Sequence, residues 1–179
     1  MEFKELIKIR RSVRKYNSDL VEEEKILRIL EAARVSPSWA NRQCWEFIVV
    51  KNKETIKKIS EYTSAKFVAE APVAIFVCAN PEKSGKRNGM DYFLVDAAIA
   101  MEHIVLAATD EGLGSCWIGA FEEKPIKELL SIPENYRIVA FTPIGYPADK
   151  KSLSETVARF AVGADTRRAL KDMLHIERW

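Results

Sequence analysis

Residues 90–114 constrain the fold more than any other part of the chain, because they form its longest apolar segment. The apolar residues cover nearly the whole circumference of a helix, whereas a surface helix shows a single apolar stripe. We therefore predict a central helix that is buried on most sides. Asp96, Glu102, His103 and Asp110 interrupt the run, so it lacks the roughly 18 uninterrupted apolar residues of a membrane span. We expect a core helix, or a core shared by two subunits.

The length of 179 residues predicts a single domain, 1–179, with a C-terminal extension from about residue 158. A formal charge of +2, with both signs mixed along the chain, gives no indication of a nucleic-acid partner. Cys44, Cys78 and Cys116 are odd in number and have no paired spacing, which favours free thiols in a reducing compartment. Residues 1–16 have no continuous hydrophobic region of a secretory signal, so we expect a cytoplasmic protein.

The rest of the chain alternates between strand and helix patterns. Apolar runs predict strands at residues 46–50, 73–79 and 136–144. Helical spacing of apolar residues predicts further helices near the N-terminus, within 21–38, after Asn52 and around 126–130, and two more at 153–160 and 164–175. This alternation indicates one layered structure of the α+β or α/β type.

Two polar segments stand out. Charge runs such as RRSVRK usually form a solvated patch, but Arg10, Ser12 and Arg14 alternate, so in an extended segment they would share one side and suit a phosphate. Residues 36–47 mix hydroxyls, amides and two tryptophans, as sites for planar ligands do. An ordinary loop, in which Asn41 and Gln43 satisfy the backbone, explains that segment equally well.

The usual catalytic constellations are absent from the sequence. With only two histidines and no Cys/His spacing, a zinc site is not expected, and His103 reads as a satisfied buried or interfacial residue. There is no Gly-x-Ser-x-Gly elbow, phosphate-binding P-loop or Gly-x-Gly-x-x-Gly motif. If the chain is an enzyme, a cofactor therefore carries the chemistry.

Four segments together resemble the FMN-dependent nitroreductases, and their order and spacing fit that family. The segments are residues 10–14 (RRSVR), 37–45 (PSWANRQCW), 112–119 (GLGSCWIG) and 143–147 (PIGYP). The resemblance implies an α+β fold, with a central, mostly antiparallel sheet flanked by helices around the long central helix. It also implies an intertwined homodimer with two FMN sites at the subunit interface.

The resemblance also implies roles for individual residues. Arg10 and Ser12 match ligands of the flavin phosphate, and Arg14 matches a ligand nearer the ribityl chain and pyrimidine edge. Pro37 and Ser38 match positions that reach the flavin from the partner subunit. The expected cofactor-binding residues are Arg10, Arg11, Ser12, Arg14, Pro37, Ser38, Asn41, Gln43, Lys66, Ile118, Gly119, Lys150 and Lys151.

This chain departs from the family pattern at two places. Cys44 replaces a usual proline, and we expect a buried, inert thiol there. After residue 147 the family tends to carry an Arg or Lys pair, for which Lys150 and Lys151 are the best matches and Arg159 a weaker one.

The implied function is hydride transfer from NAD(P)H through bound FMN to a nitroaromatic, quinone or similar small acceptor, in a ping-pong cycle. The protein would supply position and electrostatics, because a cation such as Arg14 or Lys66 near the pyrimidine edge favours the reduced, anionic ring. The alternatives are a flavin-binding sensor or storage protein without turnover, and another reaction of the same fold, such as dehalogenation.

Overall fold

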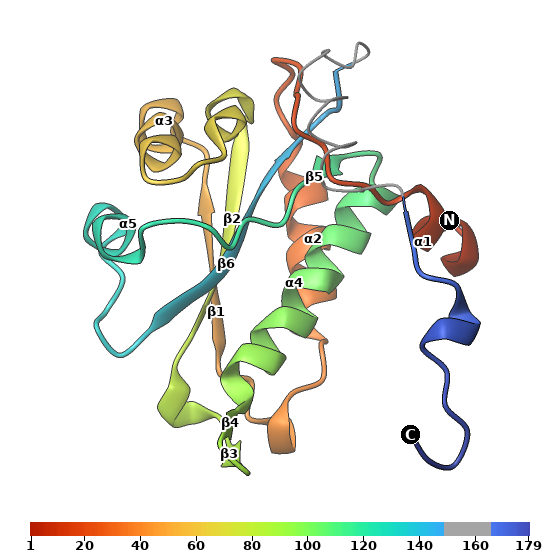
Figure 1. The fold of residues 1–179 in the computed structure, drawn as a ribbon. Helices are drawn as coiled ribbons and strands as arrows, with labels where there is room; N and C mark the ends of the chain where they lie inside the picture. Colours follow the sequence, from red (N-terminus) through yellow and green to blue (C-terminus); the bar gives the residue numbers. More distant parts are fainter. Residues whose placement is uncertain (149–165) are drawn as a thin grey trace. The chain divides into compact units, whose positions relative to one another are not determined.

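The computed structural model describes residues 1–148 and 166–179, in two compact units, Met1–Ala148 and Asp149–Trp179. The first unit contains a four-stranded antiparallel sheet with the strand order β1-β2-β6-β5 (Figure 1). The strands are β1 (Trp45–Val50), β2 (Val73–Ala79), β5 (Gly114–Ser115) and β6 (Arg137–Gly145). The α+β prediction with a mostly antiparallel sheet is confirmed.

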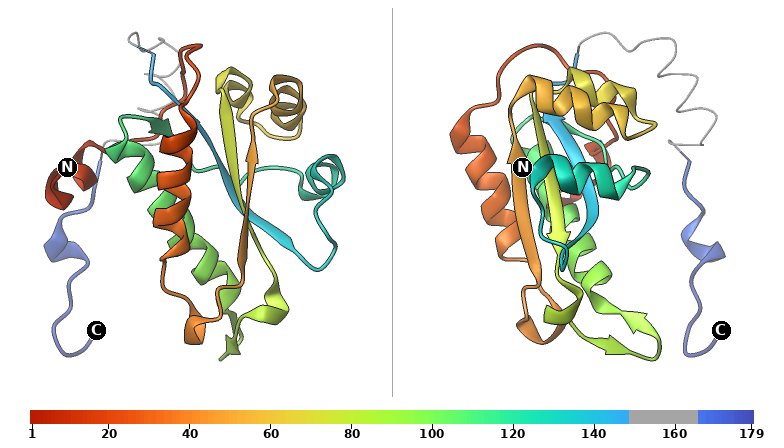
Figure 2. Two further views of the ribbon diagram at one scale, coloured as in Figure 1. Left: turned by 180° about the vertical axis from the view of Figure 1, so that it is seen from behind. Right: turned by 90° about the vertical axis from the view of Figure 1, so that its left-hand side faces the viewer.

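Helices cover both faces of this sheet. Helices α2 (Glu23–Arg34) and α4 (Tyr92–Asp110) lie on one face, and α3 (Lys53–Glu61) and α5 (Glu123–Leu130) lie on the other (Figures 1 and 2). Smaller elements complete the unit: α1 (Phe3–Ile9), η1 (Trp39–Asn41), η2 (Lys66–Glu70), η3 (Pro81–Lys83), and the hairpin of β3 (Lys86–Arg87) and β4 (Met90–Asp91).

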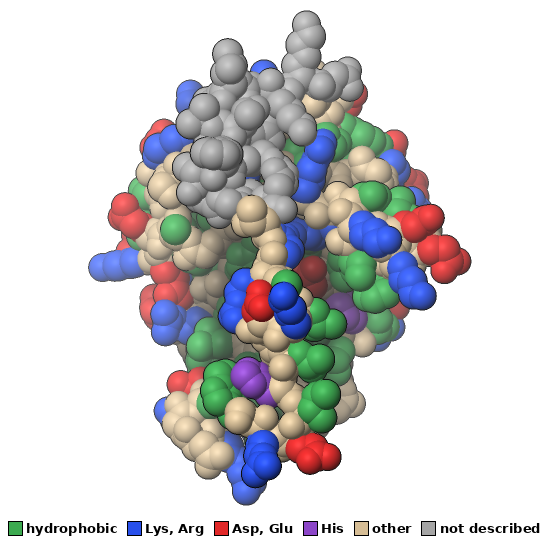
Figure 3. Space-filling view, turned by 45° about the vertical axis from the view of Figure 1, so that its right-hand side comes forward, with side chains coloured by type: hydrophobic (Ala, Val, Ile, Leu, Met, Phe, Trp, Pro, Cys, Tyr) green, Lys and Arg blue, Asp and Glu red, His purple; other side chains and the backbone are tan. Residues whose placement is uncertain are grey.

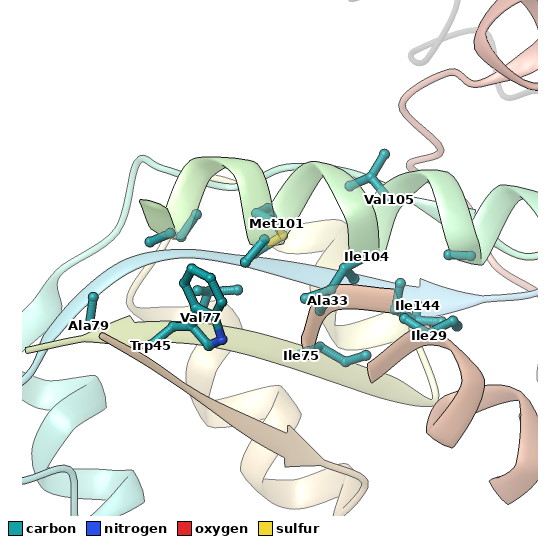
Figure 4. Close-up of a cluster of buried hydrophobic side chains, with 14 of the residues drawn as sticks. Ile29, Ala33, Trp45, Ile75, Val77, Ala79, Met101, Ile104, Val105 and Ile144 are labelled. Carbon is teal, nitrogen blue, oxygen red and sulfur yellow. The ribbon is translucent and has the colours of Figure 1, made fainter. Parts of the chain in front are cut away.

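Strand β2 separates two hydrophobic clusters, because successive side chains of a strand point to opposite faces. Every residue of β2 is buried, as its unbroken apolar sequence predicts. Ile75 and Val77 join the cluster under α2 and α4, whereas Ala74 and Phe76 join the cluster under α3 and α5. Figure 4 shows the first cluster, with Met101 and Ile104 of α4 directed toward the side chains of the sheet and α2.

Helix α4 is less buried in the single chain than its sequence predicts. Phe93, Ala97, Met101 and Ile104 recur at helical spacing on the side that packs on the sheet and α2. The other side of α4 is not covered by the chain, and Leu94 there is 48% exposed. Figure 3 shows that hydrophobic side chains also lie among the charged ones on the surface of the molecule. By length and composition alone α4 could cross a membrane, but its packing is that of a core helix covered on one side.

The end of α4 brings the chain back to the sheet. Gly112 adopts a left-handed conformation with φ of 75°, and the N–H of Leu113 donates to the carbonyl of Ala108 at 2.8 Å. Helix α4 therefore ends at Asp110, and Gly112 forms the turn that follows it. Strand β5 follows directly, so the length of α4 determines where residues 112–119 meet the sheet.

The C-terminal unit is described from residue 166. It contains one short 3-10 turn, η4 (Leu170–Asp172), where the sequence pattern predicts a helix over residues 164–175. All described residues of this unit are exposed, and a short helix without a packed apolar face is marginal in water, which accounts for the difference. The predicted helix at residues 153–160 lies outside the described residues.

Candidate functional site

The basic N-terminal segment lies against the edge of the sheet. Ser12 forms a parallel bridge with Ser115 of β5, and the N–H of Val13 donates to the Ser115 carbonyl at 2.8 Å. Val13 is buried, whereas Arg10, Ser12 and Arg14 are only partly exposed and Arg11 is exposed. Val13 therefore faces the core, and a shared side for Arg10, Ser12 and Arg14 stays a prediction.

Glycine is required where this segment crosses β5. A Cβ atom added to Gly114 would lie 2.8 Å from Cβ of Val13, closer than side chains pack. The absence of a side chain at Gly114 thus lets the basic segment reach the sheet, and this close approach sets its position.

The Gly-Tyr-Pro segment joins the same edge. Tyr16 and Pro147 form an antiparallel bridge, and the N–H of Ala148 donates to the carbonyl of Lys15 at 3.1 Å. The buried Tyr16 hydroxyl donates to the Val13 carbonyl at 2.7 Å. Three of the four motif segments therefore meet at the β5 edge of the sheet. Lys150, Lys151 and Arg159 lie outside the described residues.

Two buried polar atoms at this edge have no hydrogen-bond partner within the described residues, Nη1 of Arg14 and Oγ of Ser115. Unpaired buried polar atoms are rare in folded proteins, and a bound water, ion or other ligand is one explanation for them. The electrostatics agree, since burial raises the pKa of the Cys116 thiol while nearby Arg14, Ser12 and Arg10 oppose that rise. The arrangement can bind a polar, anionic ligand through its Arg and Ser side chains.

The turn after β5 contains two of the predicted flavin-binding positions, Ile118 and Gly119. Ile118 is buried and pairs with Phe141, with its N–H donating to the Phe141 carbonyl at 2.9 Å. Gly119 is exposed, and a Cβ atom there would meet nothing within 4 Å. Among residues 1–148 and 166–179, no backbone hydrogen bond to the Gly119 N–H is found. Of these two predicted positions, Gly119 can therefore offer its N–H to a ligand, whereas Ile118 already uses its own.

Lys66 lies at the start of η2, whose next residue, Phe67, packs against Val13 and Tyr16. The Lys66 amino group donates to the carbonyls of Ser60 and Glu61, at 3.0 and 3.2 Å. It thereby caps the C-terminal end of α3, where a cation is favourable. Phe67 thus brings η2 against the basic segment, while the amino group of Lys66 binds the end of α3.

The fourth motif segment lies elsewhere in the chain. We call residues 36–44 the Trp39 loop; its Trp39 N–H donates to Oδ1 of Asp96, in the first half of α4, at 2.8 Å. Strand β5 follows the other end of α4, and the helical rise from Asp96 to Asp110 is about 21 Å. Figures 1 and 2 show η1 and β5 at opposite ends of that helix. One chain therefore does not bring Pro37 or Ser38 to Arg10 and Ser12.

Three polar residues of the Trp39 loop, Ser38, Asn41 and Gln43, bind one another. Ser38 Oγ accepts the N–H of Gln43 at 2.9 Å, and the Gln43 side chain donates to the carbonyl and side-chain oxygens of Asn41, at 3.2 and 3.1 Å. Pro37, Asn41 and Gln43 are all exposed in this chain. The hydrogen bonds within the loop fit the ordinary loop of the first alternative. The exposure of its side chains fits a surface that is presented to a second chain.

Comparison with known proteins decides the family. Residues 7–69 and 60–146 match the Nitroreductase family. The chain belongs to the nitroreductase family. A protein of Archaeoglobus fulgidus, provisionally named NADH dehydrogenase/NAD(P)H nitroreductase, is 39% identical over 179 residues, covering 97% of each chain.

Solved structures agree with this nitroreductase assignment. A nitroreductase family protein of Clostridium novyi is 45% identical, with a TM-score of 0.81 over 87% of this chain and 91% of that one. An FMN-dependent nitroreductase of Clostridium difficile is 32% identical, with a TM-score of 0.80 over 97% and 98% of the two chains.

Other expectations for this nitroreductase chain concern single side chains. Cys44 is buried, and burial, together with the Asp96 carboxylate, raises its pKa to about 11, so the expected inert thiol is supported. Nδ1 of His103 lies 2.9 Å from the carbonyl of Ala32, which is the satisfied histidine that we expected. The predicted cofactor-binding residues did not include Ser115. Its place directly after Gly114, in the segment GLGSCWIG that resembles the family, was a sequence signal that could have identified it.

Proposed function

We propose that this nitroreductase is an NAD(P)H-dependent FMN oxidoreductase that reduces a nitroaromatic, a quinone or a similar small acceptor. The observation that carries the proposal is the β5 edge, where buried polar atoms of Arg14 and Ser115 have no partner among the described residues. The turn that follows β5 adds the N–H of Gly119, which has no backbone partner in the same part of the chain. Membership of the family and likeness to an FMN-dependent nitroreductase support the choice of cofactor.

The residues present fit FMN. Arg10 and Ser12 would bind the phosphate, which carries roughly −1.5 to −2 charges by analogy with a phosphorylated side chain. Arg14 would lie at the pyrimidine edge, and the Gly119 N–H would face the N5 region without any titrating side chain. Bound FMN supplies two-electron redox chemistry between a nicotinamide and an acceptor. Arg14 contributes by favouring the more negative, reduced form of the ring.

We further propose a homodimer with shared sites, in which Pro37 and Ser38 of one subunit approach the flavin held by Arg10 and Ser12 of its partner. The separation of these segments along α4 supports sharing, because one chain cannot place both at one ligand. The open side of α4, with Leu94 and Val95 exposed, supports a second copy as its cover. We place the protein in the cytoplasm, and the three free, buried thiols agree with a reducing compartment.

The test starts with the purified protein. Yellow protein that releases FMN on denaturation supports the site, and colourless protein that ignores added FMN would overturn it. Under anaerobic conditions NADH or NADPH should bleach the flavin absorbance, and a nitroaromatic or quinone should restore it. Initial rates at varied donor and acceptor concentrations should give parallel double-reciprocal lines, as a ping-pong cycle requires.

The same experiment separates the alternatives. Flavin that neither nucleotide reduces would favour a sensor or another electron donor. Flavin that is reduced by a nucleotide and reoxidised by a halophenol, with release of halide, would favour dehalogenation. In the second case the cofactor assignment remains and only the acceptor changes.

A further inference from the structure

Asp96 interrupts the apolar surface of α4 and is only 2% exposed. Its Oδ1 accepts the backbone N–H of Trp39 at 2.8 Å, and its Oδ2 accepts the hydroxyl of Ser84 at 2.7 Å. The Cys44 sulfur lies 3.5 Å from Oδ2. A buried carboxylate is costly unless it is hydrogen-bonded, so these donors account for a charged residue in a core helix. Asp96 thereby links three segments of the chain.

The Trp39 loop has a conformation that a free chain would rarely adopt. Ala40, Asn41 and Gln43 have positive φ angles of 46°, 55° and 49°, although none of them is glycine. Such residues are uncommon, and they persist where the surrounding structure holds the backbone in place. The N–H groups of Trp39 and Gln43, bound by Asp96 and Ser38, supply part of that restraint.

Residues 84–92 contact the loop from a second direction. A Cβ atom at Gly85 would lie 2.2 Å from Nε1 of Trp39, so the indole packs directly over this glycine. The ring centroids of Trp39 and Tyr92 are 4.2 Å apart. Nη1 of Arg42 donates to the Ser84 carbonyl at 3.0 Å. The loop therefore packs against the backbone of Ser84 and Gly85, and Asp96 is hydrogen-bonded both to Ser84 and to the loop.

We propose that Asp96 is a positioning residue, which holds the Trp39 loop in the strained conformation that one subunit presents to the FMN site of its partner. This inference rests on the proposed function, since that function gives the loop its ligand. Asp96 does not itself touch the cofactor. It acts through the position of the Trp39 backbone, which in turn fixes the neighbouring Ser38.

The first test is Asp96→Ala, measured by hydrogen exchange and by FMN affinity. Amide exchange of the peptide covering residues 36–44 should be at least tenfold faster than in the wild type, already in the cofactor-free protein. The FMN dissociation constant should rise at least tenfold. Asn52→Ala is the matched control, because Oδ1 of Asn52 also accepts a backbone N–H and a hydroxyl, both from Thr55, in a part of the chain away from the loop. It should change neither quantity, whatever its effect on thermal stability.

Conservative variants keep the test decisive if Asp96→Ala does not fold. Asp96→Asn keeps an oxygen for the Trp39 N–H and should restore most of the FMN affinity, whereas Ser84→Ala removes one contact and should show a smaller acceleration of loop exchange. A folded Asp96→Ala protein with wild-type FMN affinity would overturn the proposal. If Asp96→Ala does not fold, Ser84→Ala with wild-type exchange of residues 36–44 would overturn it. So would a loss of affinity no greater than that of Asn52→Ala. Wild-type protein that binds no FMN would instead refute the proposed function, while loop exchange would still report whether Asp96 fixes the loop.

Discussion

Replacing Arg14 with alanine should weaken FMN binding and also make the bound flavin harder to reduce. Arg14 lies beside Cys116 at the β5 edge, and its buried Nη1 has no hydrogen-bond partner among the described residues. A cation in this position interacts more strongly with the reduced, negatively charged ring than with the oxidised one. The variant therefore loses a contact that differs between the two redox states.

The size of the effect follows from one hydrogen bond, from Nη1 of Arg14 to the charged ring. A hydrogen bond to a charged group contributes about 1.5–3 kcal/mol. For a two-electron couple, 1.4 kcal/mol corresponds to about 30 mV. If the reduced ring alone gains this interaction, the midpoint potential of Arg14→Ala should fall by about 30–65 mV. Anaerobic equilibration of the bound flavin with a reference dye of known potential measures this shift.

Two further variants make the result specific to Arg14. Lys15→Ala removes the same unit charge from the next residue, whose backbone carbonyl binds Ala148, and should leave the potential within a few millivolts of wild type. Arg14→Lys keeps the charge but not the planar fork, so its potential should lie between those of wild type and Arg14→Ala. Weaker FMN binding at an unchanged potential would refute the electrostatic role and leave Arg14 as an anchor.

Three other outcomes are expected. If Arg10→Ala and Ser38→Trp each abolish FMN binding but keep the dimer, co-refolding the two inactive variants should restore about a quarter of wild-type activity. About half of randomly paired dimers are mixed, and each mixed dimer has one intact site of two. No recovery of activity with mixed dimers present would reject shared sites. Ala98→Asp, on the open side of α4, should give aggregated or unfolded protein in size-exclusion chromatography, and a folded monomer with bound FMN would contradict the dimer. The raised pKa of Cys44, about 11, keeps the thiol protonated at pH 8. Iodoacetamide should therefore label the thiol slowly at pH 8 and faster as the pH approaches 11, as measured by mass spectrometry. Rapid labelling of the folded protein at pH 8 would contradict this.

The sequence predicted the elements whose pattern reflects burial. Strand β2 is apolar throughout because both of its faces are covered, and α4 carries more apolar surface than one chain buries. The order of the four motif segments also predicted the family. The meeting of three of them at β5 was not evident from spacing alone, since it depends on the close approach of Val13 to Gly114.

Other features could not be predicted because they depend on contacts between distant residues. Asp96 looked like an interruption of an apolar helix, and its role emerges only with Trp39 and Ser84 in place. Lys66 matched a flavin ligand by position, but its amino group caps α3, an outcome decided by two nearby carbonyl groups. The left-handed residues of the Trp39 loop carry no glycine signal, so local sequence gave no indication of them.

The pairing of Tyr16 with Pro147 has a consequence for the order of events during synthesis. The basic segment leaves the ribosome early, but its partners in β5 and after β6 follow 100 residues and more later. At about 5–20 residues per second, the interval between Tyr16 and Pro147 is roughly 7–26 s. During this time the arginines of the segment have no sheet edge to bind. The proposed FMN site can therefore assemble only after nearly the whole Met1–Ala148 unit has been made, and a chain that stops earlier carries the basic segment without the sheet edge that it binds.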